Sequence, residues 1–283
     1  MTSANNRFLL PDGNVQVCFS GGRTSAYLLW KILDANDGLP DRARVVFTNT
    51  GREMPQTLNF VAECASRWGI HIDWVEYRAE APFFETVSHN SAARQGEPFA
   101  AMNAKKLYLP NFHTRFCTTE LKVRPAKRFL RSLGWERWTC AIGIRADEPR
   151  RLSKTPPKDR WTNWYPLADA GVAKRNVSAF WQAQAFDLAL PNIKGRCPLG
   201  NCDGCFLKSE ANIAALIRDY PERAAWWEEQ ERVVQVTAKK PTDAQFSRAF
   251  SRAGLRDFVQ RQSDWIFNDE AYLCQTDGGE CVY

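Results

Sequence analysis

The fold is decided by the stretch Val15-Gln16-Val17-Cys18-Phe19-Ser20-Gly21-Gly22-Arg23-Thr24-Ser25. An apolar, strand-like run ends at Phe19, and a helical pattern begins at Ala26, so the polar residues 20–25 form a strand-to-helix turn. Two glycines let the backbone of such a turn come close to a ligand. The N–H groups of the next helix's first turn, together with its dipole, favour an anion. Residues 20–25, called the 20–25 loop below, therefore predict a site for a phosphate or sulfate group.

Strand-like and helical patterns alternate through the first part of the chain. Short apolar runs rich in β-formers predict strands at 15–19, 44–48, 70–76 and 138–144. This alternation predicts βαβ units, that is, an α/β fold with a doubly wound, mostly parallel sheet covered by helices on both faces. Ligands of such sheets bind beyond the carboxyl ends of the strands, where the 20–25 loop is expected.

The strand patterns stop after about residue 170. Asn176 is expected to cap a helix that runs to about residue 190, and Ser209 to cap another that ends near residue 219. Pro221 suits the first turn of a third helix. We therefore predict two domains, an α/β core over residues 1–170 and a helical region with a cysteine-rich loop and a tail over residues 171–283.

Composition limits the partners and the compartment. The net charge is +6, which suits anionic ligands but is too small to imply nucleic acid by itself. No apolar stretch is long enough to span a bilayer, and the start Met-Thr-Ser-Ala-Asn-Asn-Arg lacks an apolar signal region. We therefore expect a cytoplasmic protein without a membrane partner. Nine cysteines, an odd number, argue against a fully paired disulfide scaffold and favour metal binding or redox chemistry.

Three cysteines lie within nine residues, in Cys197-Pro-Leu-Gly-Asn-Cys202-Asp-Gly-Cys205. Their spacing lets one loop wrap a metal ion or a cluster. The same spacing occurs among the ligands of plant-type ferredoxin clusters, and zinc uses similar arrangements. Cys117 is the best candidate for a fourth thiolate.

The 20–25 loop resembles the phosphate loop of the adenine nucleotide alpha hydrolase-like superfamily, which contains the PP-loop ATP pyrophosphatases and the sulfonucleotide (PAPS and APS) reductases. The pyrophosphatases usually have Asp where this chain has Thr24, so the loop is more similar to the reductase branch. PAPS reductase-like proteins of phages and mobile elements resemble this chain in Ser-Gly-Gly-Arg-Thr-Ser and Cys-Phe-Leu-Lys. Further stretches resemble the reductases in the same order along the chain: Asn49-Thr50-Gly51 with Pro55-Gln56-Thr57, Phe116-Cys117 with Leu121-Lys122-Val123-Arg124-Pro125, Gly143-Ile144-Arg145 with Arg150-Arg151, and Tyr165-Pro166-Leu167 with Asn176-Val177.

The resemblance implies that an adenine nucleotide (PAPS, APS or ATP) binds at the 20–25 loop. It also implies a four-iron–four-sulfur cluster held by Cys117, Cys197, Cys202 and Cys205, with structural zinc as the alternative. The expected nucleotide-binding residues are Ser20, Gly21, Gly22, Arg23, Thr24, Ser25, Asn49, Thr50, Gly51, Lys122, Gly143, Arg145, Arg150 and Arg151.

Reductases of this family act through a tail thiolate in Glu-Cys-Gly-Leu/Ile-His, which attacks the sulfate sulfur, and thioredoxin then releases sulfite. Here Glu280-Cys281 fits the start of that motif, but the following Gly-Leu/Ile-His is absent. Cys281 is therefore the candidate catalytic nucleophile, and thioredoxin a candidate partner. Two other functions stay open: an ATP-dependent sulfur-transfer or nucleic-acid thiolation enzyme, and a non-catalytic nucleotide-binding accessory of a defence or nucleoprotein complex.

Overall fold

The computed structural model describes residues 5–152, 159–193 and 197–261. Within these ranges one six-stranded sheet has the strand order β4-β3-β2-β1-β5-β6. All neighbouring strands are parallel except β3 and β4. The predicted mostly parallel α/β sheet is thus confirmed. The strands are β1 (Val15–Phe19), β2 (Ala43–Asn49), β3 (Ile72–Tyr77), β4 (Phe84–Val87), β5 (Trp138–Ala141) and β6 (Trp161–Trp164).

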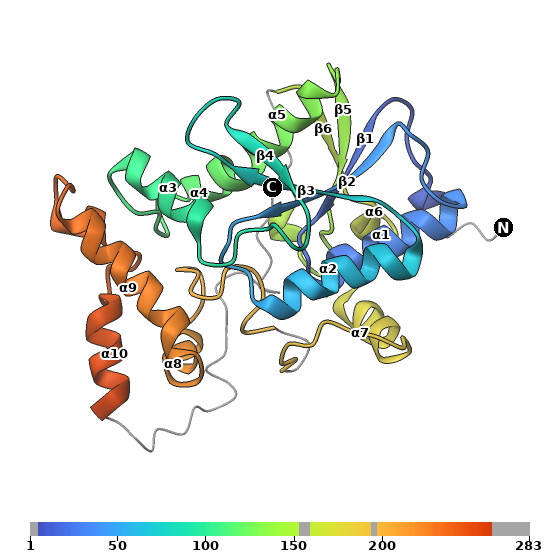
Figure 1. Cartoon of the computed structure of the whole chain (residues 1–283). Helices are drawn as coiled ribbons and strands as arrows, with labels where there is room; N and C mark the ends of the chain where they lie inside the picture. The colour runs from blue at the N-terminus through green and yellow to red at the C-terminus, as the bar shows by residue number, and fades with distance from the viewer. Residues whose placement is uncertain (1–4, 153–158, 194–196, 262–283) are drawn as a thin grey trace.

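Helices cover both faces of the sheet (Figure 1). The apolar strands alternate between these two layers: Phe19 packs in the cluster that contains α1 and α2, whereas Cys18 packs with α5. The α-helices are α1 (Arg23–Asn36), α2 (Pro55–Trp68), α3 (Glu97–Lys106), α4 (Phe116–Thr118), α5 (Arg124–Ser132), α6 (Pro166–Asp169), α7 (Lys174–Gln182), α8 (Glu210–Asp219), α9 (Pro221–Gln235) and α10 (Arg252–Arg261), and the short 3-10 or π-helical turns are η1 (Asn5–Phe8), η2 (Thr119–Val123), η3 (Pro149–Arg151) and η4 (Pro241–Ala244).

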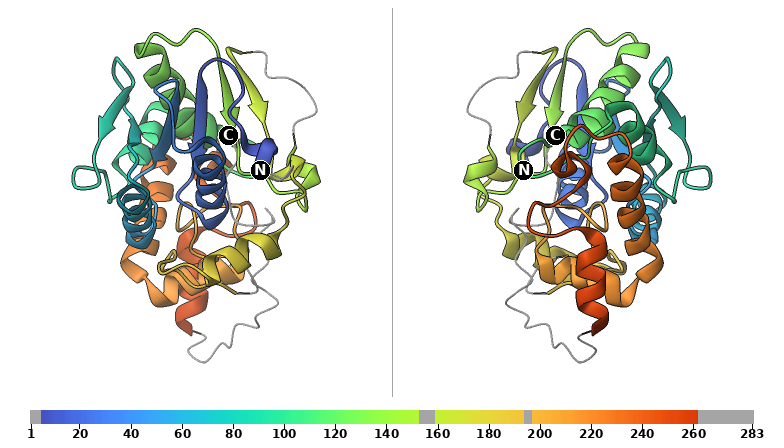
Figure 2. Two further views of the ribbon diagram at one scale, coloured as in Figure 1. Left: turned by 90° about the vertical axis from the view of Figure 1, so that its right-hand side faces the viewer. Right: turned by 90° about the vertical axis from the view of Figure 1, so that its left-hand side faces the viewer.

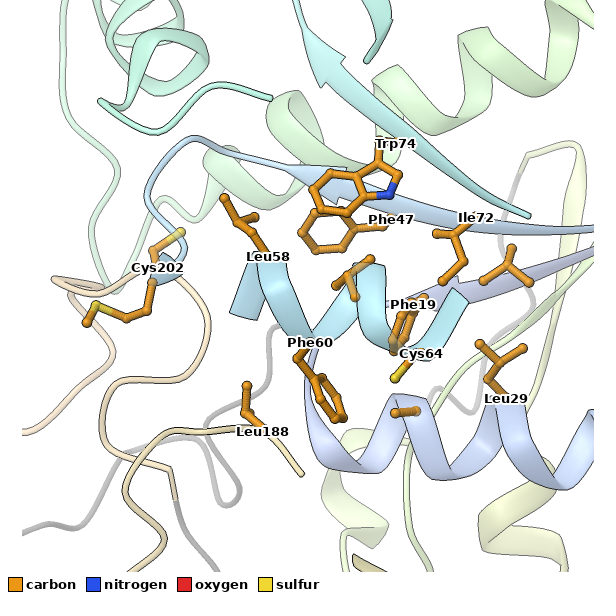
Figure 3. Packing of buried hydrophobic residues seen from close by; sticks show 14 of the residues in the cluster. Phe19, Leu29, Phe47, Leu58, Phe60, Cys64, Ile72, Trp74, Leu188 and Cys202 are labelled. Atoms are coloured by element: carbon orange, nitrogen blue, oxygen red, sulfur yellow. The ribbon is translucent and has the colours of Figure 1, made fainter. Parts of the chain in front are cut away.

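The larger core lies between the sheet and helices α1 and α2. Figure 3 shows Phe47 between Leu58 of α2 and Trp74, and Phe19 beside Cys64 of α2, on the side of Leu29 of α1. Each of these side chains is almost fully buried. The rings of Phe47 and Trp74 meet edge to face with centroids 4.8 Å apart. This packing holds the carboxyl end of β1, and with it the 20–25 loop, at a defined place.

The order of the strands reverses at β1. From β1 the chain moves outward through β2 and β3, and it later returns to the other side of β1 as β5. Right-handed crossovers then place the connecting helices on opposite faces. Between the carboxyl ends of β1 and β5 this leaves a crevice in which doubly wound proteins bind ligands.

The helical C-terminal portion comprises α8, α9 and α10, which Figure 2 shows together at one end of the molecule. The hydroxyl of Ser209 accepts from the N–H of Asn212 (3.3 Å), so it caps α8 as predicted, and Pro221 opens α9. The helix expected from Asn176 to about residue 190 is wrong at both ends. Instead α7 begins at Lys174 and ends at Gln182, and the Asn176 side chain accepts from the N–H of Ala173 (2.9 Å). The domain boundary near residue 170 stays a prediction.

A buried ionic centre joins this helical portion to the core. The carboxylate of Asp203 accepts from Arg52 (2.8 Å), from Arg223 and from the indole N–H of Trp227 (2.7 Å). Trp227 lies so close to Gly204 that an added Cβ would be 2.3 Å from its indole nitrogen. No helix in the described ranges is both long and apolar enough to cross a membrane.

Candidate functional site

The 20–25 loop turns sharply between β1 and α1. Gly21 has φ +78°, and an added Cβ would be 2.7 Å from Cγ2 of Thr57, so glycine is required here both by the backbone and by the contact. Gly22 is the N-cap of α1 and offers no side-chain acceptor. The N–H groups of the first turn have no acceptor within the helix. They are therefore available to an anion, and the helix dipole favours one.

The two serines of the loop hydrogen-bond to each other and to its backbone. The Ser25 hydroxyl accepts from the N–H of Ser20 (3.2 Å) and donates to the carbonyl of Gly22 (3.0 Å). The two hydroxyl oxygens are 2.9 Å apart. These hydroxyls fix the shape of the turn around Gly21 and Gly22.

Arg145 approaches the 20–25 loop from the segment after β5. Its Nη1 donates to the hydroxyl of Thr24 (3.2 Å), and its Nε donates to Asp147 (2.9 Å). Glu148 accepts from the backbone N–H of Arg145 (3.1 Å) and holds Arg151 as well. The two carboxylates orient the buried guanidinium of Arg145 beside the first turn of α1.

Gly143 lets the segment after β5 come this close, because an added Cβ would be 3.3 Å from Cα of Ser25. Arg150 is exposed, whereas Arg151 is partly buried and pairs with Glu148. Of these two predicted arginines, Arg151 thus supports the Arg145 segment. Neither is among the residues that line the pocket at the loop.

Arg23 has a structural partner that the sequence did not reveal. Its Nε donates to Asp187 (2.7 Å), and its Nη2 donates to the carbonyls of Leu188 and Leu190. This fork ties the start of α1 to the segment after α7. The guanidinium is therefore bonded to the 187–190 segment, while the backbone of Arg23 remains part of the anion-binding turn.

The segment after β2 forms a second buried cluster. The Asn49 amide donates to Glu76 (2.6 Å) and to the carbonyl of Ala93 (2.8 Å). The backbone N–H of Thr50 and its hydroxyl each donate to the Glu53 carboxylate (2.9 Å). Burial raises the pKa of Glu53, and the nearby Lys122 ammonium partly opposes this.

Asn49 and Thr50 therefore fix the conformation of the segment after β2 through hydrogen bonds to buried groups. Gly51 has φ +78° and lies against Gly96, with 2.9 Å between an added Cβ and Cα of Gly96. Lys122 is buried in η2 and is not among the residues lining the pocket at the 20–25 loop. The structure thus does not bring Lys122 to that loop.

A pocket opens at the 20–25 loop, and several of its residues were missed from the sequence. Thr57, at the start of α2, has a buried hydroxyl with no hydrogen-bond partner in the described ranges, which makes it available to a ligand. The stretch Pro55-Gln56-Thr57 was among those that resemble the reductases, but Thr57 was not named there as a binding residue. The pocket is lined by Gly21, Gly22, Arg23, Thr24, Thr57, Arg145, Lys174, Val177, Ser178, Leu188, Asn192, Cys197, Gly200 and Asn201.

The predicted thiolates do not form a metal site in the part of the chain that the structure describes. Cys202 is buried in the large core, and Cys117, Cys197 and Cys205 pack against that core. Among the described residues, however, no three Cys, His, Asp or Glu side chains converge closely enough to bind a metal ion. The present side-chain arrangement does not fit a four-thiolate cluster, and no step of the reaction proposed below passes through one.

Two thiols have defined local roles. Cys202 Sγ is 3.3 Å from the hydroxyl of Thr50, so the cysteine-rich loop touches the segment after β2. Cys197 lines the pocket, where burial raises the pKa of its thiol and the charges of Lys208 and Arg23 act in the opposite direction. The candidate nucleophile Cys281 lies outside the described residues.

A sequence model described as the phosphoadenosine phosphosulfate reductase domain matches residues 14–170 of this chain, which is more than half of its length. The chain belongs to this family. The match spans the sheet, the 20–25 loop and Arg145. Family membership confirms the resemblance that the loop and the downstream stretches predict.

Three known proteins are similar to this chain. An uncharacterized nin region protein, ORF290, of Escherichia phage lambda is 34% identical over 212 residues, which are 72% of this chain and 69% of the phage protein. The phosphate complex of phosphoadenylyl-sulfate (PAPS) reductase from Candida auris is 19% identical, with a TM-score of 0.41 over 66% of this chain and 82% of that chain. The U34-tRNA thiolase NcsA from Methanococcus maripaludis, with its 4Fe-4S cluster, is 12% identical, with a TM-score of 0.38 over 85% of each chain.

Proposed function

We propose that this chain binds a sulfonucleotide, PAPS or APS, with its phosphosulfate at the 20–25 loop, and reduces it to sulfite. The observation that carries the proposal is the approach of the Arg145 guanidinium to the first turn of α1. Guanidinium groups bind phosphate and sulfate oxygens through paired, charge-assisted hydrogen bonds. Membership of the phosphoadenosine phosphosulfate reductase domain family supports the same class of ligand.

The charges around the loop favour an anionic group. Arg145, Arg151 and Lys174 stand beside two carboxylates, those of Asp147 and Glu148. Asp147 accepts from Arg145 and also from the backbone N–H of Lys174 (3.1 Å), so it sets the position of two residues that line the pocket. One positive charge is left over, and it adds to the partial charge at the helix N-terminus.

In the proposed reaction the Cys281 thiolate attacks the sulfate sulfur of the bound phosphosulfate. The bond from sulfur to the bridging oxygen breaks, and the nucleotide leaves with that electron pair as AMP or adenosine 3′,5′-bisphosphate. A thioredoxin thiolate then attacks Sγ of the S-sulfocysteine, which releases sulfite and forms a mixed disulfide. The second thioredoxin thiol reduces this disulfide, so the dithiol supplies the two electrons. The role of Cys281 rests on the resemblance of Glu280-Cys281 to the family's tail motif.

The test is sulfite release from PAPS and from APS in the presence of reduced thioredoxin. We expect release by the unaltered chain and none by Cys281→Ser. Arg145→Gln is expected to raise the dissociation constant of the substrate by at least about tenfold, because it removes two charge-assisted hydrogen bonds. Arg232→Gln, an exposed residue of α9 that pairs with Glu229, is the charge-matched control. Sulfite release by Cys281→Ser would reject the tail mechanism, and failure of the unaltered chain to bind either nucleotide would reject the ligand.

A second candidate function is ATP-dependent sulfur transfer of the PP-loop type. The presence of Cys197 in the pocket that Gly21 and Gly22 line favours it, because a sulfur carrier must stand beside the activated phosphate. This function predicts cleavage of ATP to AMP and pyrophosphate, and absence of pyrophosphate would reject it. Nucleotide binding without turnover of PAPS, APS or ATP would favour the non-catalytic accessory role in a defence or nucleoprotein complex.

The iron–sulfur cluster on Cys117, Cys197, Cys202 and Cys205 is a separate proposal that rests on the sequence spacing. When bound, such a cluster would supply a fixed local charge beside the nucleotide site. Anaerobic purification followed by measurement of iron, sulfide and zinc tests it. Four irons per chain would support the cluster although the described thiols do not converge in this structure, and a colourless, iron-free protein with one zinc would support the alternative metal.

A further inference from the structure

A second pocket lies within the helical C-terminal portion and shares no lining residue with the pocket at the 20–25 loop. It has a volume of about 290 Å³ and lies between α8, α9 and α10, so we call it the α8–α10 pocket. Its walls are mainly apolar, with Ile213 and Ile217 from α8, Ala224 from α9 and Val259 from α10. Such walls favour an apolar side chain over water.

The described residues bury little of α10. Only Arg252 and Leu255 of this ten-residue helix are buried. Val259, one turn after Leu255, is only partly buried and lines the α8–α10 pocket. By contrast, α8 buries every residue from Ala211 to Ile217. Because a surface helix normally buries a continuous apolar stripe, α10 has room for a further apolar segment at this pocket.

The described part of the chain ends at the edge of the α8–α10 pocket. Gln260 lines the pocket, and α10 ends one residue later at Arg261. Residues 262–283 follow and lie outside the described residues. Only residues 262–264 separate α10 from the apolar run Trp265-Ile266-Phe267, called the 265–267 segment below. Connections of about 2–6 residues are the commonest between packed elements, so this segment is close enough to the pocket to reach it.

The side chains of the 265–267 segment suit an apolar pocket. They are two aromatic rings and one branched aliphatic group. Aromatic side chains dominate contacts of this kind, because each buries about 150–250 Å². The segment also belongs to the same chain, so its effective concentration at the pocket is on the order of millimolar. This tethering favours it over a free ligand or a second copy of the chain.

The charges of the pocket lining also favour this segment. The lining contains three arginines, Arg218, Arg252 and Arg256, and one carboxylate, that of Glu228. Arg218 and Arg256 form exposed ion pairs with the aspartates that follow them in sequence, and such pairs contribute little. Residues 262–270 contain two aspartates and one glutamate but no lysine or arginine. Positive charge at the lining therefore attracts the residues that flank the 265–267 segment.

We propose that the 265–267 segment of this chain binds in the α8–α10 pocket, with its side chains against the apolar walls. The segment then completes the packing of α10. It also fixes the point from which the rest of the tail, including Cys281, continues. This interaction needs neither the 20–25 loop nor a nucleotide.

Calorimetric titration of a synthetic peptide with the sequence of residues 262–270 into the full-length chain tests the proposal. In the unaltered chain the tethered segment competes with the peptide. We therefore expect the peptide to bind the triple variant Trp265→Ser, Ile266→Ser, Phe267→Ser at least about tenfold more tightly than the unaltered chain. A peptide that carries the same three serines should not bind.

A second substitution tests whether the peptide binds in this pocket. Ala224→Leu places a larger side chain in the α8–α10 pocket and suits a helix. Added to the triple variant, it should weaken binding of the peptide at least about tenfold, which corresponds to about 1.4 kcal/mol. Ala104→Leu, at an exposed position of α3, is the matched control and should leave the affinity unchanged.

Hydrogen exchange of the backbone amides of α10 is a readout that needs no peptide. The triple variant should exchange these amides at least about tenfold faster than the unaltered chain, because α10 loses part of its packing. Tyr272→Ser, in the tail but outside the 265–267 segment, should not change the rate.

Equal affinity of the peptide for the triple variant and the unaltered chain, or no binding to either, would overturn the proposal. Unchanged peptide binding after Ala224→Leu would do so as well. Protection of α10 that rises with protein concentration would assign the pocket to a second copy of the chain and would also overturn it. None of these results depends on PAPS or APS, so the outcome is separate from that of the proposed reductase activity.

Discussion

The guanidinium of Arg145 lies 3.2 Å from the hydroxyl of Thr24, and this contact joins the segment after β5 to the first turn of α1. Thr24 is neutral at the position where the ATP pyrophosphatases that the loop resembles usually carry Asp. A carboxylate here would cancel the one positive charge left over among Arg145, Arg151, Lys174, Asp147 and Glu148. A hydroxyl accepts from the guanidinium without adding a third carboxylate to those of Asp147 and Glu148.

Thr24→Asp should therefore lower the affinity of the 20–25 loop for anions. We expect at least about a tenfold rise in the dissociation constant of PAPS or of inorganic phosphate, which corresponds to about 1.4 kcal/mol. Calorimetric titration measures it. Thr162→Asp adds the same charge at an exposed position of β6 and should leave the affinity within error. An unchanged dissociation constant in Thr24→Asp would show that Arg145 does not contact the anion.

Gly21→Ala tests whether the sharp turn needs glycine. Both Gly13 (φ +80°) and Gly21 (φ +78°) are left-handed, but an added Cβ at Gly13 meets nothing within 4 Å, whereas at Gly21 it meets Thr57 at 2.7 Å. Gly13→Ala should thus lower the free energy of unfolding by the conformational cost alone, about 1–2 kcal/mol. Gly21→Ala should lower it by about 1–3 kcal/mol more, because the core is overpacked. Urea unfolding compares the two, and equal losses would contradict the contact.

Asp203→Asn tests the buried ionic centre. The substitution leaves Arg52 and Arg223 without their shared carboxylate, and breaking a buried pair in this way destabilises a protein by about 3–5 kcal/mol. Urea unfolding should show a loss of this size. Asp219→Asn removes a carboxylate from an exposed pair with Arg218 and should change the free energy of unfolding by less than about 1 kcal/mol. A small effect of Asp203→Asn would mean that the helical portion is held mainly by apolar contacts.

The buried Glu53 predicts a pH dependence of stability. Burial raises its pKa above the ordinary value of 4.5, so the folded state holds the proton more tightly than the unfolded state. The contribution of Glu53 to stability is consequently present at low pH and is lost as the pH rises from about 4.5 through the raised pKa. Glu53→Gln removes this dependence. Urea unfolding at several pH values should show the variant gaining relative to the unaltered chain as the pH rises, and a constant difference would contradict the raised pKa.

Local patterns predicted the sheet well because each strand near the site is a short, buried apolar run. The predicted strand 15–19 coincides with β1, and the strand expected at 44–48 lies within β2 (Ala43–Asn49). β4 and β6 were not predicted, since these edge strands are only partly buried and lack a continuous apolar run. Residues 142–144 were expected in a strand because they are apolar, but they leave the sheet after Ala141 and pack in the core.

Long-range partners explain what the sequence could not predict at the site. Arg23 was expected on the anion, yet Asp187, far along the chain, holds its guanidinium. The cysteine spacing is local information and cannot tell whether Cys117 and the cysteine-rich loop converge on one point. Asp203 carried no signal at all, because its three partners come from segments distant in sequence.

The position of Asp203 between Cys202 and Cys205 has a consequence for allosteric control. The same carboxylate binds Arg52, which follows Gly51 in the segment after β2, and Trp227 on α9. A shift of α9 is therefore coupled energetically to the thiols on both sides of Asp203 and to the chain that passes the nucleotide side of the sheet. Movement of α9 would therefore reach Cys202 and Cys205 through the backbone of Asp203, since neither cysteine lies on that helix.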